Sequence, residues 1–207
     1  FELVSKERIL LELASGLNHL HSQNHILGTL TPDTVLLTMR DNIKLECNLF
    51  VPQDINPAWL APEASTKQEC TLATDVFAYG MLAYYVLSNG THPFGTVHQR
   101  DNILQDKRAA YKGDFSHLVN LCMSIKVTKR PSTARILNHP CFWQPERHRD
   151  FFKAANEFIL SDEDIAEELD YSLPQFAKWK SRCDSGLANI TRQDDSVAGL
   201  YAFAATK

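Results

Sequence analysis

Apolar residues recur every three or four positions over residues 2–21, which predicts a helix with one buried face. Residues 73–88 are apolar on nearly every side, a pattern typical of a helix at the centre of a domain. Residues 35–38 and 43–45 flank a polar turn and predict a short β-hairpin. The pattern therefore predicts a mainly α-helical fold with one small strand pair.

Further helices are expected after the central one. The run from Asn89 to Pro93 contains Gly90 and ends the central helix, because neither glycine nor proline suits a helix interior. Shorter apolar repeats predict three more helices, at residues 100–111, 115–125 and 132–138.

The character of the chain changes near residues 143–145. Pro145 suits the first turn of a helix, and an apolar stripe follows it before an acidic stretch. We therefore expect two domains, residues 1–143 and residues 144–207, both helical.

Composition adds few constraints on function. The 207 residues are 44% hydrophobic and 22% charged, as in ordinary globular proteins, and the net charge of −4 gives no general attraction to nucleic acid or anionic lipid. Five scattered cysteines without a Cys-x-x-Cys pair argue against a disulfide framework or a zinc site and suit a reducing compartment. The longest apolar stretch is too short to span a bilayer.

Residues 26–37 resemble the catalytic loop of protein kinases, His-Arg-Asp-Leu-x-Pro-x-Asn, with Leu30 and Pro32 in register. The resemblance places the general-base Asp on Thr29 and the metal-binding Asn on Thr34. At neutral pH a threonine hydroxyl does not accept a proton as a carboxylate does, and it is a poor Mg²⁺ ligand. We therefore expect a loop that keeps the kinase frame without its reactive groups.

The second magnesium motif of kinases, Asp-Phe-Gly, has also changed. Its place is taken by Cys47, Asn48 and Leu49, so Cys47 replaces the metal-binding carboxylate. Glu46 is the alternative ligand, although a solvated charge at a strand edge is the favoured interpretation. Residues 47–63 contain no Ser, Thr or Tyr, so activation of this segment by phosphorylation is not expected.

Three structural motifs of kinases remain. Ala61-Pro62-Glu63 matches the end of the activation segment, Asp75 lies in a run that resembles the start of the central helix, and Arg130 lies in a matching Lys-Arg-Pro run. The resemblance is to the C-terminal lobe of a protein kinase. It implies a buried ion pair between Glu63 and Arg130, and an Asp75 side chain that holds the catalytic loop through backbone N–H groups.

Residues 84–95 and 138–143 are similar to the sensor kinase/endoribonucleases of the unfolded protein response, the inositol-requiring enzyme family, which is related to ribonuclease L. The resemblance implies that residues 144–207 are a partial helical KEN nuclease-like segment. When residues 192–207 are matched to the nuclease motif of this family, its catalytic Tyr, Arg and Asn correspond to Arg192, Ala205 and Thr206. No group that suits RNA cleavage is present at these positions.

These observations favour a catalytically inactive kinase-like and KEN-like module. It would act by association, as a homodimer or as a heterodimer that modulates an active unfolded-protein-response kinase/endoribonuclease. ATP and magnesium belong to the family, but no cofactor and no metal site are predicted here, and neither RNA binding nor membrane contact is expected. The expected location is the cytoplasm, on the cytosolic side of the endoplasmic reticulum membrane if the chain is part of a longer sensor.

Two alternatives remain open. In the first, the chain is part of a divergent serine/threonine kinase and endoribonuclease whose missing catalytic groups lie outside it. In the second, the chain is a gene fragment without a selected function. Binding of ATP with Mg²⁺ distinguishes the enzyme from the inactive module, because a competent site must stabilise the fold.

Overall fold

The computed structural model describes residues 5–28, 30–38, 43–45, 56–64 and 69–161, and the single residues 165, 168 and 204. The chain divides into two compact units, Phe1–Phe142 and Trp143–Lys207, and each is described by itself. Within the described residues, no helix is both long enough and apolar enough to pass through a bilayer.

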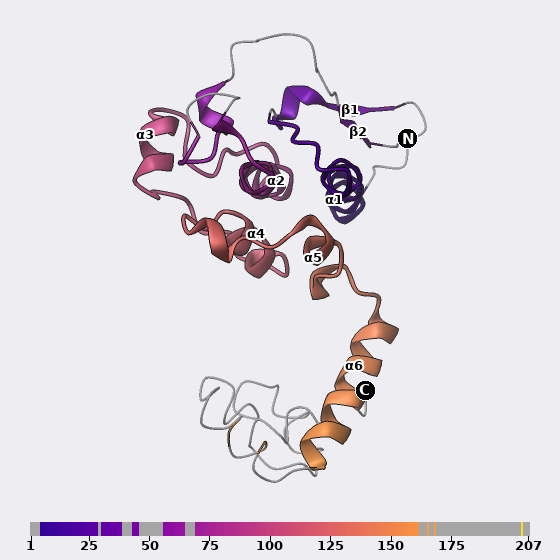
Figure 1. The fold of residues 1–207 in the computed structure, drawn as a ribbon. Coiled ribbons are helices and arrows are strands. Elements are labelled where there is room, and N and C mark those ends of the chain that lie inside the picture. Colours follow the sequence, from indigo (N-terminus) through magenta and orange to yellow (C-terminus); the bar gives the residue numbers. More distant parts are fainter. Residues whose placement is uncertain are drawn as a thin grey trace. The chain divides into compact units, whose positions relative to one another are not determined.

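The described part of the first unit is mainly helical, as the sequence predicts, with a two-stranded sheet beside α1 (Figure 1). Its helices and strands are α1 (Lys6–Ser22), β1 (Val35–Leu37), β2 (Ile43–Leu45), α2 (Leu72–Leu87), α3 (Gln99–Leu104), α4 (Ser116–Cys122) and α5 (Thr133–Leu137). Single turns of 3₁₀ helix lie at Pro32–Thr34, Pro57–Trp59, Val127–Lys129 and Pro140–Phe142.

Helix α2 is the centre of this unit. It begins with a capping box, in which the Thr71 side chain accepts a hydrogen bond from the Thr74 amide and the Thr74 hydroxyl accepts one from the Thr71 amide. All its residues from Thr74 to Tyr84 are buried. The chain then turns away through Asn89 and Gly90, whose φ angles are 57° and 91°, a left-handed conformation that continues no helix.

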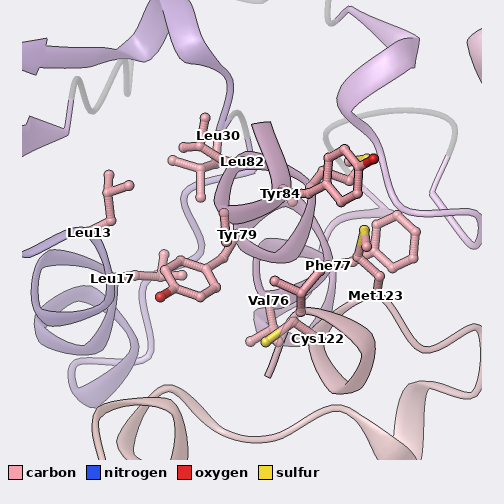
Figure 2. Close-up of a cluster of buried hydrophobic side chains, with 14 of the residues drawn as sticks. Leu13, Leu17, Leu30, Val76, Phe77, Tyr79, Leu82, Tyr84, Cys122 and Met123 are labelled. Carbon is pink, nitrogen blue, oxygen red and sulfur yellow. The ribbon is translucent and has the colours of Figure 1, made fainter. Parts of the chain in front are cut away.

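The core forms where α1 and α4 pack against α2 (Figure 2). From α1, Leu13 and Leu17 are fully buried, and the Tyr79 hydroxyl of α2 donates a hydrogen bond to the Leu10 carbonyl at 3.1 Å. On the α4 side, a Cβ added to Gly80 would lie 2.8 Å from the Cβ of Cys122. Glycine at this position therefore permits the close approach of α2 and α4.

The strand pair is antiparallel, with Val35 opposite Leu45 and Leu37 opposite Ile43. Helix α1 holds it in place, because the Glu12 carboxylate accepts a hydrogen bond from the Ile43 amide at 2.7 Å. This bond lowers the pKa of Glu12. The two strands predicted at residues 35–38 and 43–45 are therefore present and paired.

The helix predicted at residues 100–111 is wrong in its extent, since α3 ends at Leu104. The chain reverses at Asp106, whose φ is 50°, and the Lys107 amide donates a hydrogen bond to the Asn102 carbonyl at 2.8 Å. The Ala109 amide then bonds to the Pro93 carbonyl, so the following residues leave the helical path. The pattern of apolar residues does not predict the left-handed backbone conformation of Asp106, so it did not predict where α3 ends.

The described part of the second unit is mostly the amphipathic helix α6 (Pro145–Leu160), which begins with proline as predicted. The Trp143 ring, immediately before the N-cap residue, lies 5.4 Å from the rings of His148 and Phe151, and the Arg147 guanidinium lies over it at 4.6 Å. These contacts stabilise the start of the helix. The expected KEN-like segment stays a prediction.

Candidate functional site

Asp75 holds the loop that resembles the kinase catalytic loop. It lies in the first turn of α2 and is buried, and its two carboxylate oxygens accept hydrogen bonds from the backbone amides of Leu27 and Gly28, both at 2.8 Å. His21 Nε2, from the end of α1, is 3.0 Å from Asp75 Oδ2, and both side chains are almost completely buried. Three donors thus converge on one carboxylate and fix the start of the loop.

Thr34, which the resemblance places on the metal-binding Asn, closes a local turn. Its hydroxyl donates a hydrogen bond to the Thr31 carbonyl and accepts one from the Thr31 amide, each at 3.0 Å. This arrangement is the capping box of the turn Pro32–Thr34, in which Pro32 presets the backbone. The hydroxyl therefore has a structural role that does not need a metal ion.

Several residues that the sequence analysis singled out lie outside the described residues. They are the two other degenerate kinase positions and the three nuclease-like positions: Thr29, Cys47, Arg192, Ala205 and Thr206. Among the residues that are described, no group of three or more His, Cys, Asp or Glu side chains can hold a metal ion.

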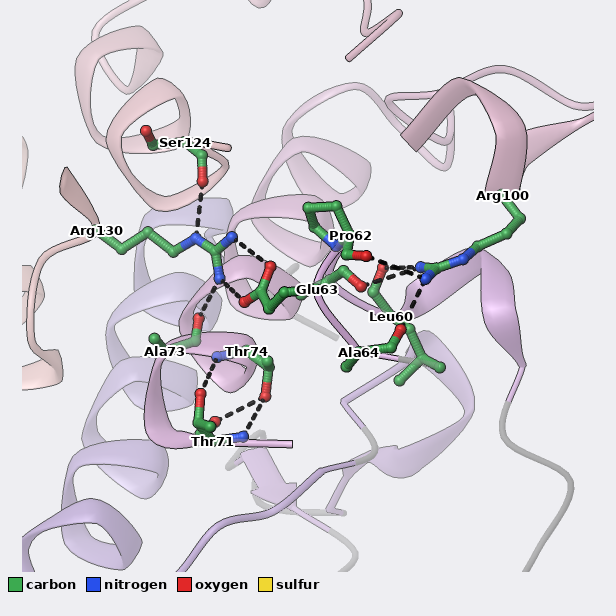
Figure 3. A network of polar contacts seen from close by, with 11 residues as sticks. Leu60, Pro62, Glu63, Ala64, Thr71, Ala73, Thr74, Arg100, Ser124 and Arg130 are labelled. Atoms are coloured by element: carbon green, nitrogen blue, oxygen red, sulfur yellow. Dashed lines mark hydrogen bonds and ion pairs between the residues drawn. The ribbon is translucent and has the colours of Figure 1, made fainter. Parts of the chain in front are cut away.

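The structure brings Glu63 and Arg130 together (Figure 3). The guanidinium donates to both carboxylate oxygens of Glu63, with Arg130 Nη2 at 2.8 Å from Oε2. It also donates to the backbone carbonyls of Ala73 and Ser124, at 2.9 and 2.8 Å. Because the Arg130 side chain is fully buried, this bidentate pair fixes the segment containing Glu63 to α2 and to the end of α4.

Arg100 holds the same segment from the other side, and sequence reasoning gave it no role. Its guanidinium lies against four backbone carbonyls at 2.7 to 3.4 Å: Leu60, Ala61, Pro62 and Ala64. Burial lowers the pKa of Arg100, whereas the nearby Glu63 opposes this effect. Arg100 projects from α3, and Figure 3 shows it approaching the segment opposite Arg130. The role of Arg100 could not be predicted from periodicity or motifs, because the four carbonyls come together only when the chain folds.

His92 is a buried structural residue, as its place before Pro93 suggests. Its Nδ1 accepts a hydrogen bond from the Phe94 amide at 3.2 Å, so its Nε2 carries the proton and donates to the Ala58 carbonyl at 3.0 Å. The Trp59 ring packs edge-on against it at 4.7 Å. Burial lowers the pKa of His92.

A cavity of about 600 Å³ lies between α1, α2 and α5. His21 and Arg130 form part of its wall, so it lies beside both polar contacts described above. Two residues of its wall are joined directly, since the Thr133 hydroxyl donates a hydrogen bond to Asn18 Oδ1 at 2.9 Å. Within the described residues no buried side-chain nitrogen or oxygen lacks a hydrogen-bond partner.

Residues 2–139 match the protein tyrosine and serine/threonine kinase family, and the chain belongs to this family. It is related to the IRE1-type kinases. It is 26% identical over 212 residues to the serine/threonine-protein kinase/endoribonuclease ire-1 of Caenorhabditis elegans, covering 86% of this chain and 22% of that protein. It is 29% identical over 184 residues to the human serine/threonine-protein kinase/endoribonuclease IRE2, covering 74% of this chain and 20% of that protein.

A further relative carries a different description. The inactive serine/threonine-protein kinase/endoribonuclease IRE1-like of Arabidopsis thaliana is 27% identical over 183 residues, covering 75% of this chain and 32% of that protein. The chain thus spans about a fifth to a third of the length of these curated relatives.

Proposed function

We propose that this chain is part of a catalytically inactive, kinase-like protein that acts by association, either with itself or with an active kinase/endoribonuclease of the IRE1 type. The observation that carries the proposal is the contrast within one loop. Asp75 holds the amides of Leu27 and Gly28, so the scaffold is intact, whereas the Thr34 hydroxyl is engaged in a local turn.

The chemistry of phosphoryl transfer supports this proposal. Kinases hold Mg²⁺ through an Asp and an Asn and orient the acceptor hydroxyl with a second Asp. The aligned residues here are Cys47, Thr34 and Thr29, none of which is a carboxylate or an amide. A hard cation prefers such oxygen ligands, so the site lacks both its metal ligands and its proton acceptor.

The polar contacts of the scaffold support association. The Glu63–Arg130 pair and the carbonyl contacts of Arg100 order the segment around Glu63 without any phosphorylated residue. An ordered surface loses little conformational entropy on binding a partner. The description of one relative as inactive is consistent with a non-catalytic branch of this family. Residues 144–207 would contribute a KEN-like segment that also lacks the nuclease groups, at Arg192, Ala205 and Thr206.

A direct test is phosphoryl transfer and nucleotide binding by the purified protein. We expect no transfer of labelled phosphate to itself or to a basic protein substrate, and no Mg²⁺-dependent increase in melting temperature with ATP. A triple variant, Thr29→Asp, Thr34→Asn and Cys47→Asp, is the matched control and should gain Mg²⁺-dependent stabilisation. Transfer by the unaltered protein would overturn the inactive assignment.

Association is tested separately. Sedimentation velocity over a range of concentrations should show a dimer of the protein, or a complex with an active IRE1-type relative, and RNA cleavage by that relative should change on addition. Monomeric behaviour throughout, together with unchanged cleavage, would contradict the partner-based role while leaving the catalytic result unaffected.

The intact scaffold also suits the second candidate, a divergent serine/threonine kinase and endoribonuclease. Active kinases need the same anchoring of the loop and of the Glu63 segment. The phosphoryl-transfer experiment decides between the two when it is done on the longer protein of which this chain is part, since the second candidate places its missing catalytic groups outside the chain and only it then predicts labelled product.

A further inference from the structure

His117, His139 and Cys141 form a polar cluster, and none of the three belongs to the kinase-like site. His117 belongs to α4, and the other two residues lie in the turn that ends the first unit. His139 Nε2 is 2.9 Å from His117 Nδ1, and His139 Nδ1 is 2.9 Å from Cys141 Sγ. The two imidazole rings stack with centroids 5.2 Å apart. The cluster therefore links α4 to the final turn of this unit.

The hydrogen bonds determine where the protons lie. The Cys141 amide is always a donor, and its acceptor is His139 Nδ1, at 3.2 Å. The proton of neutral His139 must then be on Nε2, which donates to His117 Nδ1. Every bond in the cluster thus points toward His117, whose Nδ1 is the final acceptor.

The cluster is suited neither to nucleophilic chemistry nor to metal binding. Burial raises the pKa of Cys141 to about 12, so its sulfur remains a thiol at neutral pH. The two ring nitrogens of His139 face different partners, so one cation cannot contact all three side chains. Among the described residues, no group of three His, Cys, Asp or Glu side chains is arranged to hold a metal ion. Hydrogen bonding is the remaining role.

We propose that the His117–His139 contact is a pH-sensitive link, which joins α4 to the final turn at neutral pH and opens when both rings are protonated. A proton added to His139 Nδ1 faces the Cys141 amide but leaves the Nε2–H of His139 bonded to His117 Nδ1. A second proton, on His117 Nδ1, faces that Nε2–H, so two N–H groups then meet and only the neutral cluster satisfies all its contacts.

The surroundings favour the neutral state. Burial and the neighbouring His117 both lower the pKa of His139. The titratable groups that face Cys141 from the packed helices are Glu7 of α1, Tyr79 of α2 and Cys122 of α4. Burial raises the pKa of Tyr79 and Cys122, so neither carries a charge at neutral pH.

The sign of the pH effect follows from the lowered pKa of His139. The stabilising contribution is complete above the ordinary histidine pKa of about 6.5 and is lost as the pH falls from there through the folded-state pKa. The apolar contact of Phe115 with Phe142, with ring centroids 5.5 Å apart, does not titrate. Opening is therefore local to the polar cluster.

Hydrogen exchange of the full chain at about pH 7 and about pH 5 tests this link. After correction for the intrinsic pH dependence, exchange of the Cys141 amide should rise about tenfold at the lower pH. In a His139→Asn variant the rise should vanish, because an Asn oxygen still accepts from that amide without titrating. A His98→Asn variant, at an exposed histidine that also has a positive φ, should keep the rise.

Equal corrected exchange at both pH values would overturn the proposal, as would a rise that persists in His139→Asn. If that variant does not fold, NMR titration of the unaltered chain decides. The His139 ring is expected to titrate below about pH 6.5, because its pKa is lowered, and titration of this ring at the ordinary value would contradict the link. The proposal does not depend on the proposed function.

Discussion

Asp75 and Gly28 are joined by a hydrogen bond of 2.8 Å from the Gly28 amide to Asp75 Oδ1. In the register that the resemblance to the kinase catalytic loop gives, Gly28 falls on the arginine of His-Arg-Asp, and its φ of 71° is left-handed. Its neighbour Leu27 donates to the second oxygen of the same carboxylate. The backbone of the loop is therefore held in a defined conformation although the arginine side chain is absent.

Replacing Asp75 with Asn should lower the free energy of unfolding by about 3 kcal/mol. The amide has one acceptor oxygen for three donors, and its NH₂ group would face the Leu27 amide or the Gly28 amide. Urea denaturation measures the loss. Asp114→Asn, at an exposed aspartate, is the control and should change stability by less than about 0.5 kcal/mol. Equal effects of the two substitutions would show that Asp75 does not hold the loop.

The loss of stability caused by substitutions of Gly28 should depend on how well each new residue tolerates a left-handed backbone conformation. Gly28→Ala should destabilise the protein by about 1 kcal/mol, and Gly28→Val by more, because a Cβ is unfavourable at a φ of 71°. Gly28→Asn should cost less than Gly28→Ala, since asparagine tolerates this region. Urea midpoints of the three variants give the order. An equal loss for Asn and Ala would indicate that space, and not conformation, decides.

The sequence predicted the parts of the structure that depend on local pattern. The cap at Thr71 and the apolar run after it specify α2, and the alternation around a polar turn specifies the strand pair. Glu63 and Arg130 were chosen from short motifs 67 positions apart, and the structure places their side chains in contact. Here a family resemblance supplied what spacing alone does not.

Other features depend on tertiary structure. The end of α3 is set by Asp106 in a left-handed conformation, and a helix pattern does not report a backbone angle. The role of Arg100 requires four carbonyls to converge from a separate segment. His117 and His139 lie 22 positions apart with no shared motif, so their contact is visible only in the folded chain.

The Glu63–Arg130 pair should show strong coupling in a double-mutant cycle. Arg130→Met should cost about 3 kcal/mol, because it leaves the Glu63 carboxylate and the carbonyls of Ala73 and Ser124 without their buried donor. Combined with Glu63→Gln, the total loss should be smaller than the sum by about 1 to 2 kcal/mol. Additive losses would mean that Arg130 acts through the backbone carbonyls alone.

Arg100 should control the local stability of residues 60–64. In Arg100→Gln, hydrogen exchange in this segment should increase about tenfold relative to the unaltered chain, because the four carbonyls lose their common donor. Arg149→Gln, at an exposed arginine of α6, should leave the exchange unchanged. Unchanged exchange in Arg100→Gln would assign the order of this segment to the Glu63–Arg130 pair alone.

His92 should make the folded chain less stable in mild acid. Burial lowers the pKa of His92, so the protonated form is disfavoured in the folded state relative to the unfolded state. Its stabilising contribution is present above the ordinary pKa of about 6.5 and decreases as the pH falls from there through the lowered folded-state pKa. Protonation at Nδ1 also removes the acceptor of the Phe94 amide.

Urea denaturation between about pH 7.5 and about pH 5 measures this dependence. A His92→Gln variant lacks the titrating group, so the difference in unfolding free energy between it and the unaltered chain should narrow as the pH falls. The matched control is His98→Asn, whose imidazole is exposed, and its difference from the unaltered chain should stay nearly constant. His139 contributes in the same direction, but it is present in all three proteins and cancels in each difference. A constant difference for His92→Gln would show that His92 has the same pKa in the folded and unfolded chains, because only a shift in pKa on folding makes stability depend on pH.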